Sequence, residues 1–217
     1  MLATRMNANE TPTTLPFTAS SQTSVYPSVC LLSNSLNSKL DDNHLNKKSN
    51  ELEMDDFHLL NDNWNLWVHL PHDNDWTINS YKKIYTLKTI EETIALMETL
   101  PDAMVKNCML FLMRDGIKPT WEDPKNRNGG CFSYKVSNKL VCSVWKELSY
   151  VLVGGSISKN VSFVANVTGI TISPKKNFCI IKIWMSDCSY QNPAIVTTDV
   201  NELPSQGSLF KKHEPEY

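Results

Sequence analysis

The order of strand-like and helix-like segments constrains the fold of this chain more than any other feature. Six segments favour strands through alternating apolar residues or a high content of β-branched and aromatic residues. Two others carry apolar residues at helical spacing, and each follows a pair of strand segments. The expected strands are 63–70, 82–89, 108–117, 131–137, 161–173 and 178–188, and the expected helices are 89–100 and 140–155. This order predicts an α+β fold, in which an antiparallel sheet carries its helices on one face.

Both expected helices carry signals at their ends. Thr89, followed three residues later by Glu92, matches a capping box, which satisfies free backbone donors at a helix start. The second helix has an apolar stripe that includes Trp145, and the glycines 154 and 155 end it. We therefore expect Trp145 to lie in the core.

Composition divides the chain into two parts. Residues 1–57 are rich in Ser, Thr, Asn and Pro and lack apolar periodicity, so they cannot bury enough surface to offset the entropy lost on ordering. We expect them to form a disordered tail. The remaining segments are apolar enough for a core, which predicts a single folded domain over 58–217 with a polar end from Asn192 onward.

Charge and cysteine usage exclude several classes of protein. A net charge of −2 argues against non-specific binding to a nucleic-acid backbone, which requires a basic surface. No apolar run is long enough to span a bilayer, and the N-terminus lacks the apolar centre of a signal peptide. The six cysteines form no CxxC pair, so we expect reduced, buried thiols. Together these features predict a cytoplasmic protein without a membrane anchor.

Few side chains suggest a metal site or catalysis. His69 and His72 flank a Leu-Pro pair, but no cluster of carboxylates or cysteines joins them. One acidic pair, Glu122 and Asp123, lies in a distinctive loop, and a single pair without further ligands is weak support for magnesium chemistry. We expect no metal, no cofactor and no catalytic residue.

The most distinctive segment is the loop 116–130, GIKPTWEDPKNRNGG. Its prolines fix the backbone and its closing glycine pair permits positive φ, so the loop has a defined shape. Trp121 and Glu122 stand side by side in it. One interpretation is a loop anchored by a buried indole beside a solvated carboxylate. The other is a slot for a flat, cationic ring, which the indole would stack on and the carboxylate would bind at its edge.

A second tryptophan lies in a comparable position. Trp76 follows the polar turn His-Asp-Asn-Asp, at or just beyond a loop tip, where an apolar residue is poorly placed for a core. It either folds back on its own hairpin or faces a ligand.

These segments resemble the eukaryotic messenger-RNA cap-binding translation initiation factor family. The matching text is HLLNDNWNLWVHL, the Trp76 loop, DGIKPTWEDPKNRNGG, VWKELSYVLVGGS and IKIWMSDC, in family order over residues 58 to about 190. The resemblance implies a curved antiparallel sheet with helices on its convex face and a 7-methylguanosine site on its concave side.

The resemblance also implies roles for particular residues. Trp76 and Trp121 would sandwich the methylated base, Glu122 would accept hydrogen bonds from its edge, and Trp184 would lie against the N7 methyl group. Methylation makes the purine cationic, which strengthens its stacking on indole. No catalytic group is required.

The phosphate site departs from the family pattern. Basic residues are expected in the turn before the Trp184 strand, where Lys175 and Lys176 lie, but a lysine position closer to Trp184 is Ile180 here. Lys211 and Lys212 would supplement the turn. A family arginine just after the glycine pair is Cys131.

The resemblance further implies that the helical back face docks a scaffold protein or repressor. The family tryptophan of the first helix is Ile94 here, and a neighbouring leucine of the second helix is Lys146, so the specificity should be altered. The expected partner-binding residues are His58, Ile90, Ile94, Lys146, Glu147 and Gly154.

Three functions follow from these observations. The first is cap binding in translation initiation, with capped messenger RNA as the partner. The second is a cap-binding competitor or repressor that does not recruit the usual scaffold, as in a divergent paralogue or a viral homologue. The third, remote, is an enzyme that processes caps or nucleotides.

Overall fold

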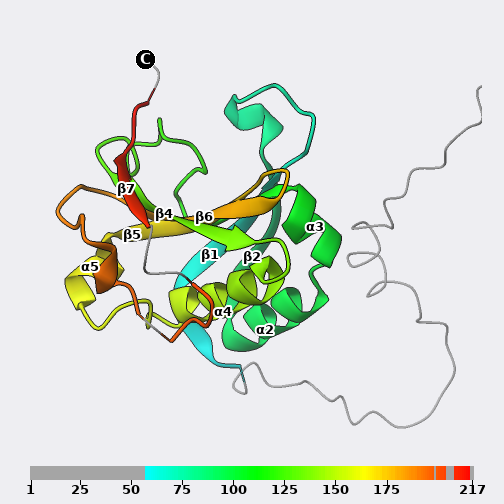
Figure 1. Ribbon diagram of the computed structural model, residues 1–217. Coiled ribbons are helices and arrows are strands. Elements are labelled where there is room, and N and C mark those ends of the chain that lie inside the picture. The colour runs from blue at the N-terminus through cyan, green and yellow to red at the C-terminus, as the bar shows by residue number, and fades with distance from the viewer. Residues whose placement is uncertain (1–56, 198, 204–207, 216–217) are drawn as a thin grey trace, which may run out of the picture. The chain divides into compact units, whose positions relative to one another are not determined.

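The computed structural model describes residues 57–197, 199–203 and 208–215 (Figure 1). The expected tail 1–57 therefore lies outside the described residues except for Phe57, and so does Cys30. The described residues between 58 and 215 include every segment for which a strand or helix is expected.

The strands form one curved, antiparallel sheet in the order β2-β1-β3-β5-β6-β4-β7. Non-consecutive strands therefore lie next to each other, which brings loops that are distant in sequence to the same end of the sheet. The strands are β1 (Leu59–His69), β2 (Lys82–Thr89), β3 (Met109–Arg114), β4 (Gly130–Ser137), β5 (Val167–Pro174), β6 (Phe178–Met185) and β7 (Leu209–Lys212).

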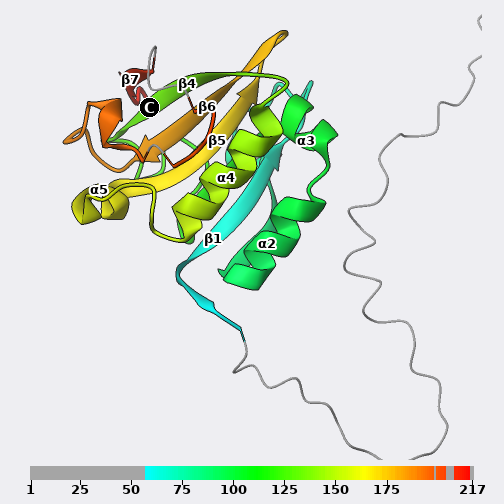
Figure 2. The ribbon, with the colours of Figure 1, turned by 60° about the horizontal axis from the view of Figure 1, so that its bottom comes forward.

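Helices α2, α3 and α4 cover one face of this sheet (Figure 2). The main core lies between the two layers and includes Trp145, which is 1% exposed, as the apolar stripe predicts. The α-helices are α2 (Ile90–Thr99), α3 (Asp102–Asn107), α4 (Val141–Val153) and α5 (Val161–Asn166), with short 3-10 helices η2 (Ile78–Ser80) and η3 (Pro193–Ile195).

The predicted capping box is confirmed at the start of α2. The Thr89 hydroxyl accepts a hydrogen bond from the Glu92 backbone N–H at 3.1 Å, and the Glu92 carboxylate accepts one from the Thr89 N–H at 3.1 Å. The predicted end of α4 is also confirmed, because Gly155 has φ +68 and supplies the left-handed residue that ends a helix.

The prediction of a continuous β-rich segment over 161–173 is wrong in its first half. Residues 161–166 form α5, and only the second half is strand β5. The Asn160 side chain accepts a hydrogen bond from the Phe163 N–H at 3.0 Å, and Phe163 is fully buried. An N-cap and one buried anchor thus override a local β preference.

Helix α3 and strand β7 are also not predicted by the sequence. Helix α3 has one turn and a half and follows Pro101, and β7 is a four-residue strand in the polar C-terminal segment. Strand β7 exists because Gly130 to Ser133 of β4 pair with it. Elements this short carry no periodicity of their own.

Candidate functional site

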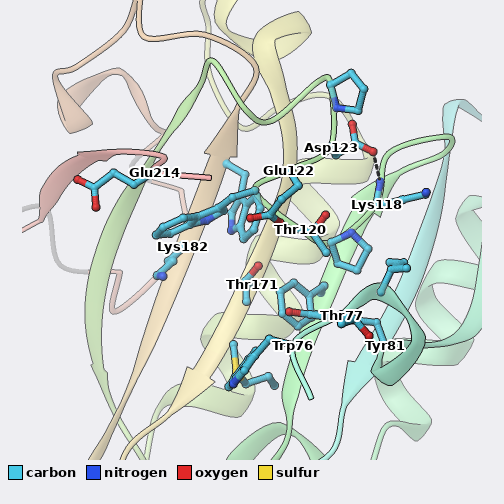
Figure 3. A pocket seen from close by; sticks show the side chains of 17 residues that line it. Trp76, Thr77, Tyr81, Lys118, Thr120, Glu122, Asp123, Thr171, Lys182 and Glu214 are labelled. Atoms are coloured by element: carbon cyan, nitrogen blue, oxygen red, sulfur yellow. Dashed lines mark hydrogen bonds between the residues drawn. The ribbon is translucent and has the colours of Figure 1, made fainter. Parts of the chain in front are cut away.

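The second face of the sheet carries a cleft of about 780 Å³ (Figure 3). Phe111, Thr171 and Lys182 are cross-strand partners on β3, β5 and β6, so their side chains share this face. Figure 3 shows Glu122 on one side of the view, Trp76 on the opposite side and Thr171 between them. The cleft therefore lies between two loops and is floored by the sheet.

Trp121 lies in a loop whose backbone groups form hydrogen bonds with side chains of the same loop. The buried Asp123 carboxylate accepts from the N–H groups of Lys118 at 2.9 Å and Lys125 at 2.8 Å. The buried Asn126 amide donates to the carbonyls of Lys118 at 3.0 Å and Thr120 at 2.9 Å. Asp123 thus shapes the loop, while its neighbour Glu122 is exposed and lines the cleft.

The glycine pair that closes this loop does not act as predicted. Neither Gly129 nor Gly130 has positive φ. Instead, a Cβ on Gly129 would lie 1.7 Å from the Met185 carbonyl oxygen, and one on Gly130 would lie 2.6 Å from the Phe210 ring. The glycines are required because the loop end packs directly against β6 and β7.

Trp76 folds back on its own hairpin, as one of the two interpretations proposes, and is also accessible from the cleft. Its ring stacks on the buried His69 of β1, with centroids 4.4 Å apart and planes 3° apart, so it does fold back on its own hairpin. It is nevertheless 59% exposed and lines the cleft. One indole face is therefore packed against the protein while most of the side chain remains accessible.

Short polar contacts hold the Trp76 loop. His69 Nε2 donates to the Asp75 carbonyl at 2.9 Å. The Asp75 carboxylate accepts from the Thr77 N–H at 2.8 Å and from its hydroxyl at 2.9 Å, and these bonds lower the Asp75 pKa. The loop is thereby fixed on both sides of Trp76.

Trp121 is likewise covered on one face by a histidine. The His213 ring stacks on it with centroids 5.3 Å apart and planes 16° apart. His213 Nδ1 lies 2.7 Å from the Asn126 carbonyl oxygen, which can only accept, so Nδ1 carries the proton. Burial lowers the His213 pKa, and the nearby Lys182 charge lowers it further against a raising contribution from the Asn126 hydrogen bond.

Trp184 forms part of the cleft floor. It is 4% exposed, lies on β6, and its ring contacts His213 with centroids 4.9 Å apart. Cys131, its cross-strand partner on β4, is also buried, and burial raises the pKa of its thiol. Both belong to the apolar cluster of the cleft face.

The sequence interpretation missed Lys182, which lines the cleft. Its ammonium lies 5.7 Å from the Trp121 ring centroid. The strand alternation contained the signal, because residues 182 and 184 of one strand point to the same face. Tyr81 also lines the cleft, and burial with the nearby Glu122 charge raises its pKa to about 12.

The basic residues expected to bind phosphates are divided between two places. Lys175 and Lys176 are exposed in the β5–β6 turn, which lies about 20 Å along β6 from Trp184. Lys211 lies nearer, with its ammonium 5.4 Å from the Trp121 centroid and 3.4 Å from the Glu214 carboxylate. Lys212, the next residue of β7, is exposed.

The expected partner-binding residues lie on the helical side of the sheet. Ile90 and Ile94 of α2 are 43% and 47% exposed, so their apolar side chains are accessible on this side. His58 precedes β1, and its Nδ1 contacts the Glu91 carboxylate at 2.8 Å.

Two of the expected residues on α4 are engaged in polar contacts. The Lys146 ammonium and the Tyr150 hydroxyl both donate to Glu98 of α2, at 2.9 Å and 3.1 Å. Glu147 accepts from the Asn201 N–H at 2.8 Å, and Gly154 caps the helix. A polar bridge thus crosses from α4 to α2.

No helix among the described residues is both long and apolar enough to cross a membrane. No group of three or more His, Cys, Asp or Glu residues in the same part of the chain could hold a metal ion.

The chain matches a known protein family over most of its described residues. Residues 59–213 match the family model of eukaryotic initiation factor 4E. The chain is 28% identical over 136 residues to eukaryotic translation initiation factor 4E-1 of Caenorhabditis elegans, covering 60% of this chain and 63% of that one. It is 29% identical over 133 residues to the eukaryotic translation initiation factor 4E homolog of Acanthamoeba polyphaga mimivirus, covering 54% and 45%. The match thus spans less than two thirds of these relatives.

Solved structures resemble the fold as well. The complex of C. elegans eIF4E-3 with the 4E-binding protein Mextli and a cap analog matches with a TM-score of 0.55 and 25% identity, over 60% of this chain and 75% of that one. Ascaris suum eIF4E-3 in complex with an m7G cap matches with a TM-score of 0.54 and 25% identity, over 61% and 76%.

Proposed function

The chain belongs to the eukaryotic initiation factor 4E family, and we propose that residues 58–217 form one domain that binds the 7-methylguanosine cap of messenger RNA in translation initiation. One observation carries the proposal. Trp76 and Trp121 come from separate loops and line the same cleft, each with one ring face covered by a histidine. Their other faces remain for a flat ligand.

The residues around these indoles suit a methylated guanine. Its positive charge would add a cation–π attraction to stacking on Trp76 and Trp121. The exposed Glu122 carboxylate would accept from the guanine N1–H and the exocyclic amine as charge-assisted hydrogen bonds. The Trp121 backbone N–H would donate to O6, and the apolar edge of Trp184 would meet the N7 methyl group.

The lysines near Trp121 would bind the cap phosphates. The Lys182 and Lys211 ammonium groups lie 5.7 Å and 5.4 Å from the Trp121 centroid, which supports contacts with the phosphates closest to the base. Lys212 follows Lys211 on β7, and the alternation of the strand turns its side chain to the other face, so it would reach only phosphates at the edge of the sheet. Lys175 and Lys176, farther along β6, would contact the distal phosphates or the following nucleotide.

A fluorescence titration with 7-methyl-GTP and GTP tests this function. Stacking should quench indole emission strongly with the methylated nucleotide and weakly with GTP. Trp76→Ala should lose the methyl-dependent quenching, while Ile94→Ala, which removes an exposed apolar side chain from the opposite layer, should retain it. Equal binding of both nucleotides by the wild type would show that this cleft takes a different ligand.

We further propose that the helical face binds a scaffold or repressor segment with altered specificity. The relatives' solved structures include complexes with 4E-binding proteins. In this chain the bridge from Lys146 and Tyr150 to Glu98 crosses between the helices next to a cavity of about 200 Å³, and Ile94 offers a smaller anchor than the family tryptophan. This bridge favours the second candidate function, a cap-binding protein that does not recruit the usual scaffold.

Calorimetry with a scaffold-derived helical peptide separates the two roles. A dissociation constant below the micromolar range would support an initiation role. No detectable binding would support the role of a competitor. Lys146→Leu combined with Ile94→Trp should raise the affinity for the peptide if the bridge and the smaller anchor limit docking.

We propose that the protein acts without catalysis, in the cytoplasm where capped messages are translated. Recognition by stacking, edge hydrogen bonds and charge needs no nucleophile or metal. Cap hydrolysis that requires magnesium and disappears in Glu122→Gln would contradict this proposal and support an enzyme.

A further inference from the structure

We propose that the Lys182 ammonium and the methylated base compete for the cleft-facing surface of Trp121, so that Lys182 weakens binding of the base and strengthens binding of the phosphates. The inference rests on the proposed function and deepens it.

Trp121 offers only one face to a ligand. The other face is covered by His213, which is 2% exposed and does not line the cleft. The His213 backbone N–H donates to the Gly129 carbonyl at 2.9 Å, and its ring is bonded to the Asn126 carbonyl at 2.7 Å. His213 is therefore fixed in place, and a base that stacks on Trp121 must use the side that faces the cleft.

Lys182 approaches the same indole from the cleft. It lines the cleft, and its ammonium is 5.7 Å from the Trp121 centroid, within the range of a cation–π interaction. Its position on β6 is set by pairing with Thr171 on β5 and Ser133 on β4, neither of which carries charge. The alternation of the strand thus directs this lysine toward Trp121 rather than toward the helices.

The other cation near this ring is held differently. Lys211 lies 5.4 Å from the Trp121 centroid, but its ammonium is 3.4 Å from the Glu214 carboxylate and it does not line the cleft. Of these two lysines, Lys182 is therefore the one that lines the cleft a stacked base would enter.

A cationic base and an ammonium that approach the same ring face would compete for it. An N7-methylated base would displace the ammonium, because both are attracted by the same negative face of the indole. The long, flexible stem of lysine lets the ammonium turn away without moving the strand, and the phosphates of the same ligand offer it a stronger partner. Lys182 should therefore lower the affinity for the base and raise the affinity for the phosphates.

The test compares Lys182→Met with the wild type, using 7-methylguanosine and 7-methyl-GTP in calorimetric or fluorescence titrations. Methionine keeps an unbranched stem and removes the charge. We expect the nucleoside to bind about twofold to fivefold more tightly and the triphosphate to bind about threefold to tenfold more weakly. Lys106→Met, which removes a lysine charge from α3 in the helix layer, should change neither affinity by as much.

A spectroscopic measurement tests the competition directly. The side-chain protons of Lys182 should show a ring-current shift from Trp121, and saturation with 7-methylguanosine should remove it. The inference is overturned if the nucleoside affinity of Lys182→Met is unchanged or falls with that of the triphosphate, or if the ring-current shift survives saturation. Failure of the wild type to prefer methylated nucleotides would instead overturn the proposed function, so the two failures are distinguishable.

Discussion

His213 lies face to face with Trp121, with ring centroids 5.3 Å apart and planes inclined by 16°. The imidazole comes from the end of β7 and the indole from the loop between β3 and β4, so two distant segments build one wall of the cleft. The Asn126 carbonyl anchors the imidazole at 2.7 Å. The orientation of Trp121 thus depends on the segment at the end of strand β7.

This contact predicts that His213 positions Trp121 for the base. His213→Ala should weaken 7-methyl-GTP binding about threefold to tenfold, because an indole without backing loses its fixed orientation. His213→Phe should restore most of the affinity, since a flat ring returns to the same place. Titration of both variants measures this, and equal affinities for Ala and Phe would show that the stacking contributes nothing.

The buried histidine also predicts a pH-dependent stability. Burial lowers the His213 pKa below its ordinary value of 6.5, so below this pH the unfolded chain binds more protons than the folded chain. The contribution of neutral, buried His213 to the free energy of unfolding is therefore complete above about pH 6.5. It is lost as the pH falls toward the His213 pKa of the folded state. The melting temperature of the wild type should fall between pH 7 and 5 more than that of His213→Phe. Equal falls in the melting temperature of the two proteins over this pH range would contradict the prediction.

Trp145 in the main core and Trp121 at the cleft should respond differently to truncation. Trp145→Ala should lower the free energy of unfolding by about 3–5 kcal/mol, because it opens a cavity in the main core. Trp121→Ala should leave the melting temperature nearly unchanged and remove most of the 7-methyl-GTP affinity. Thermal melts and titrations of both proteins check this contrast. A large loss of stability in Trp121→Ala would assign that indole a structural role.

Glu122 should determine the preference for guanine. Glu122→Gln preserves the shape but removes the charge and one acceptor oxygen, so 7-methyl-GTP should bind about tenfold more weakly. The inosine analogue, which lacks the exocyclic amine, should lose less. A competition assay with both nucleotides measures the difference. If Glu122→Gln retained the wild-type ratio of the two affinities, the carboxylate would not read the base edge.

Substitution of Lys175 tests whether the cap phosphates contact the β5–β6 turn. If the β5–β6 turn contacts them, Lys175→Ala should lower the affinity for a capped dinucleotide and make it less dependent on salt. Titrations at two ionic strengths, with Lys182→Met alongside, assign the contacts. A change in Lys182→Met alone would place the phosphates near Trp121 and away from the turn.

Local signals in the sequence determined the main elements of the fold. The capping box at Thr89 and the apolar stripe of α4 were sufficient, because helix ends and buried faces depend on residues a few positions apart. The family-specific WED segment of the Trp121 loop likewise pointed to the cleft. The α5 helix was missed because its Asn160 cap and the buried Phe163 act against a local β preference.

The tertiary structure decided what covers each tryptophan and which cations reach the cleft. The sequence contains His69, His213 and Lys182, but only the strand order β3-β5-β6-β4-β7 brings the end of β7 behind Trp121 and Lys182 in front of it. It also decided the role of Gly129, which is required for its contact with the β6 backbone rather than for its φ angle. Contacts between distant segments depend on long-range pairing, and no local pattern encodes that pairing.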